Sequence, residues 1–140
     1  VNLKEGGWFS FLGFDFRLSR NREGKTYASK TPRKKKRQEI GKKIKAALKA
    51  NWNKPFKEVI QTVNAIIRGW VNYFRIGNSN SAFSKVRDYL EMKVRKFVLR
   101  RKKLKGFGWK RWSREEIYGK WGLYNDYRIR YVYPKANPGR

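Results

Sequence analysis

Few side chains in this sequence are suited to catalysis. The 140 residues include no histidine and no cysteine, which excludes an imidazole base, a thiol nucleophile and a zinc site of the usual ligand types. Asp15, Asp88 and Asp126 lie far apart, and none belongs to a paired-carboxylate motif of the kind that two-metal phosphoryl transfer uses. Glu115 and Glu116 are adjacent rather than facing, which is typical of acidic residues at a helix N-terminus. We therefore predict no catalytic residue, no metal site and no cofactor in this chain.

Lysine, arginine and aromatic side chains are abundant instead. The sequence has 37 Lys and Arg against 10 Asp and Glu, a formal net charge of +27, and 16% of its residues are aromatic. Solubility is normally served by a net charge of roughly 2–8, so a charge this large indicates a polyanionic ligand that relieves the self-repulsion. Lys and Arg contact phosphate, and aromatic rings stack on unpaired bases. These properties predict nucleic-acid binding, with structured RNA favoured as the partner.

The basic residues concentrate in runs and on the polar faces of expected helices. One such run is usually only a solvated surface, but several runs flanking one small helical core favour a continuous binding surface. The candidate nucleic-acid contacts are Arg33, Lys34, Lys35, Lys36, Arg37, Lys42, Lys43, Lys85, Arg95, Arg100, Arg101, Lys102, Lys103, Lys110 and Arg111. Among the aromatic residues, Trp70, Phe74, Phe83 and Phe97 fall on apolar helical stripes and are expected in the core. Trp109, Trp112 and Trp121 fit either a core position or base stacking.

The N-terminal part of the sequence predicts a β-hairpin. Residues 12–18 alternate between apolar and other side chains, which is the period of a strand, and residues 25–29 can return as its partner after a polar turn. An isolated hairpin is marginally stable. The apolar run at residues 8–12 therefore suggests a missing or intermolecular neighbour, and it is a possible site of self-association.

Three helices are expected next, around one core. The first covers residues 31–50, with Thr31 as N-cap and Pro32 in the first helical position. Basic residues at its start oppose the helix dipole, which favours an anion docking there. The second runs from about Pro55 to Gly77 and is the most apolar, and the third covers residues 82–103. Their short connector favours antiparallel packing.

The C-terminal part predicts a short helix and an extended end. Ser113 and Glu116 have the spacing of a capping box, and Gly122 would stop the helix that follows. Residues 129–133 alternate in a way that fits a strand or an extended tail. The predicted fold class is thus mainly α, within α+β. We expect a hairpin at 1–30, a three-helix bundle at 31–105 and a basic, aromatic extension at 106–140.

Several segments together resemble one known family. Residues 11–14 (FLGF), followed by a hairpin, resemble the last motif of the palm in group II intron reverse transcriptases. Residues 64–75 (NAIIRGWVNYFR) resemble the signature helix of the maturase-specific, or X/thumb, domain of the same proteins, and this is the most specific match. Residues 112–115 and 121–128 resemble what often follows that domain. The order and spacing of these segments cover nearly the whole chain.

This resemblance implies a role within an RNA-directed DNA polymerase. Residues 1–30 would end the palm and residues 31–105 would form the thumb, which binds the intron RNA and the template–primer duplex and supports splicing and mobility. It implies the remainder of the palm as a partner, Mg²⁺ only in that absent catalytic palm, and a bacterial cytoplasmic location. Polymerase activity by these 140 residues alone is not expected.

Within the signature helix, Arg68 and Arg75 are further candidate contacts. They lie about two turns apart on one helical face, from which both could reach a common phosphate path. Asn72 and Tyr73 would support that surface through hydrogen bonds. The alternative is that Arg68 pairs with a carboxylate such as Glu58 or Asp88.

Two other function classes remain open from the sequence. The chain could be an independent basic protein that binds duplex DNA or the ribosome. A role at a membrane surface is less favoured: the basic, amphipathic stretch at residues 40–48 lacks aromatic residues on its apolar side, and no stretch approaches the roughly 20 apolar residues that span a bilayer.

Overall fold

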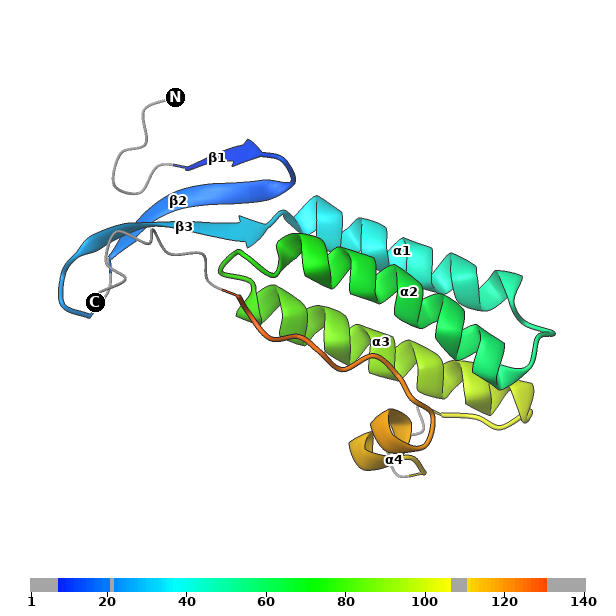
Figure 1. The fold of residues 1–140 in the computed structure, drawn as a ribbon. Coiled ribbons are helices and arrows are strands. Elements are labelled where there is room, and N and C mark those ends of the chain that lie inside the picture. Colours follow the sequence, from blue (N-terminus) through cyan, green and yellow to red (C-terminus); the bar gives the residue numbers. More distant parts are fainter. Residues whose placement is uncertain (1–7, 21, 107–110, 131–140) are drawn as a thin grey trace.

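The computed structural model describes residues 8–20, 22–106 and 111–130, which form a small sheet and a helical bundle (Figure 1). The sheet is antiparallel and has the order β1-β2-β3, with β1 at Trp8–Phe11, β2 at Phe14–Arg20 and β3 at Thr26–Pro32. The apolar run expected to need a neighbour is therefore itself a strand, paired with β2. Leu12 and Gly13 were predicted as strand residues but form the turn between β1 and β2. Both have a positive φ, of 54° and 85°, as a tight two-residue hairpin turn favours.

The first helix, α1 (Lys34–Ala50), begins three residues after the predicted cap. Thr31 is not an N-cap, because it pairs with Asp15 in the sheet, and Pro32 ends β3 opposite Phe14. The residue at the N-cap position is Arg33. Its backbone is extended, and its side chain forms no capping hydrogen bond. Its backbone N–H donates to the carbonyl of Gly13 at 2.9 Å. Pairing in the sheet thus outweighs the local preference of a Thr-Pro sequence for a helix start.

The helices α1, α2 (Phe56–Phe74) and α3 (Asn80–Arg101) form the predicted three-helix bundle. Figure 1 shows that α2 runs antiparallel to its neighbours, so that α1 and α3 run in the same direction away from the sheet. The fully buried side chains at the centre of the bundle are Ile44, Val59, Val63, Ile67, Val71, Leu90 and Val94. None of the described helices is long and apolar enough to cross a membrane.

The sheet is fixed to the bundle where α2 turns into α3. Phe14 of β2 is buried, and its ring lies 4.8 Å from that of Phe74 at the end of α2. The connector and β3 exchange two hydrogen bonds, from Asn78 N–H to the Lys30 carbonyl at 2.6 Å and from Lys30 N–H to Asn78 Oδ1 at 3.0 Å. Gly77 permits this approach, because a Cβ there would lie 2.7 Å from Phe14 Cε1 and 2.9 Å from the Lys30 carbonyl oxygen. The role of Gly77 is therefore close packing.

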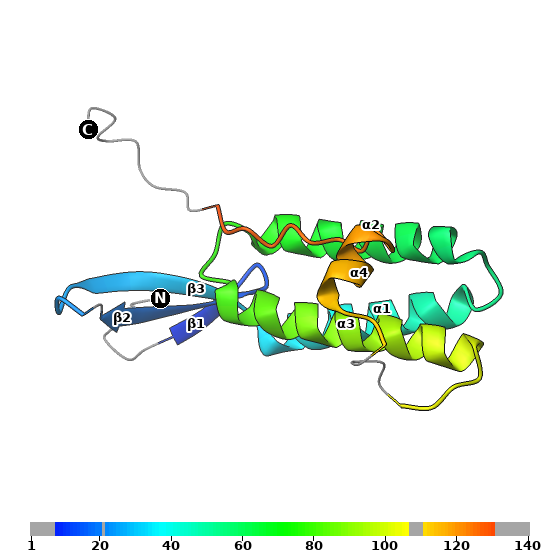
Figure 2. The same ribbon diagram turned by 90° about the horizontal axis from the view of Figure 1, so that it is seen from below.

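The C-terminal part packs on the side of the bundle formed by α2 and α3. The predicted cap is confirmed: Ser113 precedes α4 (Arg114–Gly119), and its hydroxyl accepts from the Glu116 N–H at 3.3 Å. Residues 120–130 then return toward the sheet without regular secondary structure, alongside α2 (Figures 1 and 2). Of the expected strand or extended tail, residues 129 and 130 are described, and they are not part of a strand. Its predicted continuation, with Tyr131 and Tyr133, lies outside the described residues.

Candidate nucleic-acid interface

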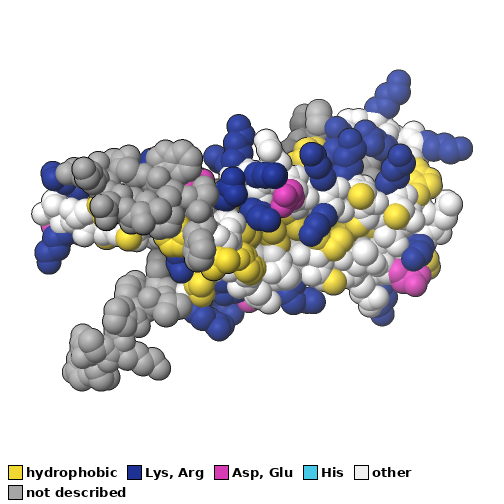
Figure 3. Space-filling model, turned by 90° about the horizontal axis from the view of Figure 1, so that it is seen from above, with side chains coloured by type: hydrophobic (Ala, Val, Ile, Leu, Met, Phe, Trp, Pro, Cys, Tyr) yellow, Lys and Arg dark blue, Asp and Glu magenta, His cyan; other side chains and the backbone are white. Residues whose placement is uncertain are grey.

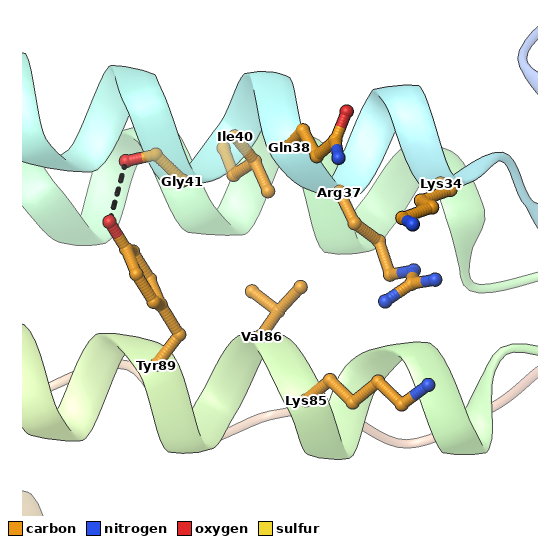
Figure 4. Close-up of a pocket in the computed structure, with 8 residues that line it drawn as sticks. All are labelled: Lys34, Arg37, Gln38, Ile40, Gly41, Lys85, Val86 and Tyr89. Atoms are coloured by element: carbon orange, nitrogen blue, oxygen red, sulfur yellow. Dashed lines mark hydrogen bonds between the residues drawn. The ribbon is translucent and has the colours of Figure 1, made fainter.

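A groove lined by cations lies between the parallel helices α1 and α3. At the end nearest the sheet, Lys34 and Arg37 of α1 face Lys85 of α3 across a floor of Ile40 and Val86. Figure 4 shows the three basic side chains directed into the space between the two helices. The backbone of α1 comes close to α3 further along, where the hydroxyl of Tyr89 donates to the Gly41 carbonyl at 3.5 Å.

A second hollow, the distal pocket, continues the groove toward the far end of the bundle. Its described lining residues are Lys45, Leu48, Lys49, Trp52, Lys93, Lys96, Phe97 and Arg100. The two hollows lie along the same seam between α1 and α3, on either side of the Tyr89–Gly41 contact. Together they hold eight cations, and we call this surface the basic groove: Lys34, Arg37, Lys45, Lys49, Lys85, Lys93, Lys96 and Arg100. The described lining of the groove contains no Asp or Glu.

Mutual repulsion in the groove is visible at Lys93. Its pKa is lowered by burial and by the positive charges of Lys45, Lys96 and Arg100. Two of these neighbours share α3 with Lys93 and one reaches it from α1. Since nothing acidic lines this part of the described groove, an external anion would remove the repulsion. The groove therefore has the electrostatics of an anion-binding surface.

Helical geometry divides the basic run at residues 33–37 among several directions. At about 100° per residue, consecutive side chains cannot share one face. Lys34 and Arg37 line the basic groove, whereas Lys36 pairs with Glu39 at 3.3 Å and Arg33 approaches Asp15 at 3.9 Å. Lys35 is exposed, as are the predicted contacts Lys42 and Lys43. The space-filling view in Figure 3 shows Lys and Arg side chains gathered over the bundle, with few acidic side chains among them.

Arg75 is a predicted contact that the structure places in the interior. It is 8% exposed, and its guanidinium donates to the carbonyls of Arg128 and Asp126, the hydroxyl of Tyr124 and the side chain of Asn72, at 2.7 to 3.3 Å. Its Nη1 also lies 3.3 Å from Asp126 Oδ1. Arg75 thus binds the C-terminal segment to the end of α2. This differs from the expectation of a shared phosphate path with Arg68, so we leave Arg75 out of the interface.

The residues around Arg75 show how this part of the signature helix is used. Arg68 is exposed, and its guanidinium lies 5.6 Å from the centre of the Tyr124 ring. Asn72 accepts from Arg75, and the Tyr73 hydroxyl donates to the Leu12 carbonyl at 2.5 Å. Both of these hydrogen bonds are structural. An exposed Arg68 stays a candidate contact.

Arg95 is the second predicted contact found in the interior. It is 2% exposed, its Nε donates to the Trp112 carbonyl at 3.0 Å, and its Nη1 lies 3.7 Å from Glu91. Glu91 is fully buried and accepts from Arg114 Nε at 2.9 Å and from the Tyr118 hydroxyl. Burial and the hydrogen bond to Glu91 raise the pKa of Tyr118. These contacts fix α4 to α3, so Arg95 also lies outside the interface.

The end of α3 and the segment that follows it contain further predicted contacts. Arg100 lines the distal pocket, and Lys102, Lys103 and Arg111 are exposed. Arg101 is partly committed to the fold, since its Nη1 donates to the Lys54 carbonyl at 2.9 Å. Lys110 lies outside the described residues.

Two of the three tryptophans that the sequence could not assign to the core or to base stacking pack against the core. Trp112 and Trp121 pack against it, with ring centroids 5.3 Å apart. Trp109 lies outside the described residues. The contacts predicted from the sequence did not include five residues that line the distal pocket: Lys45, Lys49, Lys93, Lys96 and Trp52. The sequence shows only that each of them lies on the polar face of a helix or near its end. Their common location depends on how α1 and α3 pack.

The fold and the groove define a basic three-helix module with a surface suited to a polyanion. Residues 37–119 match the group II intron, maturase-specific domain, and the chain belongs to this family. The match spans α1 from Arg37, all of α2 and α3, and α4. A comparison with curated proteins found no match.

Proposed function

We propose that this maturase-specific domain binds folded group II intron RNA through the basic groove and so assists splicing and mobility of the intron. The observation that carries the proposal is the groove itself, in which eight cations from two parallel helices meet without an acidic residue in the described lining. Folded RNA is recognised mainly through phosphates, 2′-hydroxyls and shape, which such a surface suits.

The dimensions of the groove support a ligand of several nucleotides. The 17 residues of α1 form a helix about 25 Å long. Phosphates of one strand of B-form DNA follow each other at about 3.4 Å along the axis, and those of A-form RNA follow more closely, so the groove runs beside about seven or more of them. A ligand of this length engages both the sheet end and the distal pocket. A small anion would occupy only one of them.

We extend the proposal to the template–primer duplex of reverse transcription. In this role the bundle is the thumb, and the remainder of the palm, with its catalytic Mg²⁺, lies outside the 140 residues. The residues proposed to contact nucleic acid are those of the basic groove, together with exposed Lys35, Lys42, Lys43, Arg68, Lys102, Lys103 and Arg111. Family membership and charge support this proposal.

A salt-dependent affinity series tests the proposal. The domain is titrated into cognate intron RNA, an unrelated folded RNA of equal length and a DNA duplex, at several salt concentrations. We expect the tightest binding to the intron RNA and a steep decrease with salt. A wide preference for the DNA duplex would contradict the proposal and would favour an independent DNA-binding protein.

Matched variants assign the binding to the groove. Lys45→Gln with Lys93→Gln removes one charge from each wall of the groove. The fold should tolerate this change, because the two ammonium groups repel each other, as the effect of Lys45 on the pKa of Lys93 shows. Each lost phosphate contact flattens the logarithmic salt slope by about 0.7–0.9, so we expect a decrease of roughly 1.5. Lys57→Gln with Lys120→Gln removes two exposed charges that do not line the groove, and should leave the slope unchanged. Equal slopes for the two double variants would reject the groove as the binding surface.

A further inference from the structure

The distal pocket contains an aromatic side chain that the phosphate-binding role does not require. Trp52 follows directly on the last turn of α1 and remains 40% exposed. Its ring meets that of Phe97 edge to face, with centroids 5.3 Å apart and planes at 84°. Phe97 is itself buried, so Trp52 stands on the core with part of its ring system open to solvent.

The turn that carries Trp52 is held in place from both sides. Asn51 donates through its side chain to the Ala47 carbonyl at 2.6 Å, and Trp52 N–H donates to the Lys49 carbonyl at 3.3 Å. From α3, Arg101 donates to the Lys54 carbonyl at 2.9 Å and lies over the Phe97 ring at 5.1 Å. The indole is therefore positioned before any ligand arrives, which reduces the entropy lost on binding.

Positive charge surrounds this exposed indole. Lys45 and Lys49 come from α1, and Lys93, Lys96 and Arg100 come from α3. The sheet end of the groove differs, because its aromatic residue, Tyr89, is covered by the Lys93 ammonium at 5.5 Å and directs its hydroxyl to Gly41. An aromatic platform ringed by cations thus occurs at the distal end. That combination matches a nucleotide, which has a flat base and a charged phosphate.

We infer that the distal pocket binds one unpaired nucleotide of a folded RNA, with its base stacked on Trp52 and its flanking phosphates on the surrounding lysines. A base inside a duplex is already stacked on its neighbours and cannot meet the indole, so the pocket selects bulges and loops over continuous helix. The inference rests on the proposed function and specifies which element of the RNA the groove recognises.

The test compares two short RNA duplexes that differ by one nucleotide. One carries a single bulged 2-aminopurine, and the other has the same strands without the bulge. We expect the domain to bind the bulged RNA more tightly and to quench the 2-aminopurine fluorescence. Trp52→Ala should weaken binding to the bulged RNA by about 5- to 150-fold, the range for loss of one stacked base, and should abolish the quenching. Its affinity for the continuous duplex and its salt slope should stay unchanged.

Two further variants separate stacking from damage to the fold. Trp52→Phe keeps a ring and should retain most of the preference for the bulge. Tyr27→Ala removes an exposed aromatic of β3 that does not line the groove, and should change neither affinity. If Trp52→Ala melts at a lower temperature, Trp52→Phe decides between stacking and a structural role of the ring. A ring that only supported the fold would not quench the fluorescence of the bulged base.

The possible failures are distinguishable. Salt-dependent binding that the groove lysines control, together with equal affinities of Trp52→Ala and the unaltered domain for the bulged RNA, overturns the nucleotide pocket alone. Binding of neither RNA through those lysines overturns the proposed function as well. A poly-glutamate peptide that displaces the bulged RNA at lower concentration than competing bulged RNA would assign the pocket to an acidic protein segment and would also overturn the inference.

Discussion

Replacing Glu91 by alanine should be among the most destabilising single changes in this domain. The carboxylate is fully buried and faces three donors, Arg114 Nε, the Tyr118 hydroxyl and Arg95 Nη1. Arg114 is half exposed, so water can replace the lost acceptor there. The Arg95 side chain is 3% exposed and would be left as a buried charge without its counter-ion. Breaking a buried pair in this way costs about 3–5 kcal/mol, a large part of the roughly 5–15 kcal/mol that stabilises a typical domain.

A double replacement tests whether the cost comes from the orphaned charge. Glu91→Leu with Arg95→Met removes both ions and fills the space with apolar side chains, which is often neutral for a buried pair. The Tyr118 hydroxyl and the Trp112 carbonyl would still each lose a hydrogen-bond partner, at a cost of about 1 kcal/mol apiece. We therefore expect a loss of roughly 2 kcal/mol, smaller than that of Glu91→Ala.

Urea denaturation followed by circular dichroism measures both variants and Arg95→Met. The midpoint should fall furthest for Glu91→Ala, with an unchanged dependence on urea concentration. A loss of less than about 1 kcal/mol in Glu91→Ala would mean that the buried arginine needs no counter-ion. A double variant less stable than Glu91→Ala would mean the same.

Three further outcomes follow from single contacts. Arg75→Lys should lower the free energy of unfolding by about 2–3 kcal/mol, measured in urea, because an ammonium cannot match the planar set of acceptors around the guanidinium. Gly77→Ala should lower the melting temperature, since its Cβ would collide with Phe14 at an expected cost of about 1–3 kcal/mol; an unchanged melting temperature would contradict the close packing. The hydrogen bond from Arg128 lowers the pKa of Asp126 to about 2, below that in the unfolded chain, so its stabilising contribution is present above about pH 4 and lost as the pH falls through 2. Stability measured from pH 5 to pH 2 should therefore fall more steeply in the unaltered domain than in Asp126→Asn, and parallel curves would argue against this.

The elements set by local patterns were predictable from the sequence. The apolar side chains of α2 recur at helical spacing, and Val63, Ile67 and Val71 are buried as this spacing requires. Ser113 and Glu116 fix the start of α4 through a contact three residues apart. Such features depend on neighbours in the chain, which a sequence displays directly.

Features set by distant segments were not predictable. Thr31 and Pro32 have a good local signature for a helix start, but β2 lies beside them and pairs with Thr31. Arg75 and Arg95 lie among charged and apolar helix positions, and nothing nearby in the sequence shows that residues 112–128 return to cover them. Helical periodicity alone therefore cannot show whether an arginine outside the apolar stripe of a bundle helix faces solvent or a later segment of the chain.

The candidate interface combines both kinds of information. The excess of positive charge predicts a polyanionic ligand from composition, yet the groove exists only because α1 and α3 pack in parallel, which brings together residues 48 positions apart such as Gly41 and Tyr89. The same packing forces Lys45 and Lys93 close enough to lower the pKa of Lys93. The folded domain therefore carries a repulsion that the unfolded chain avoids. A ligand that neutralises it binds the folded state preferentially, so anion binding and stability of the bundle are thermodynamically linked.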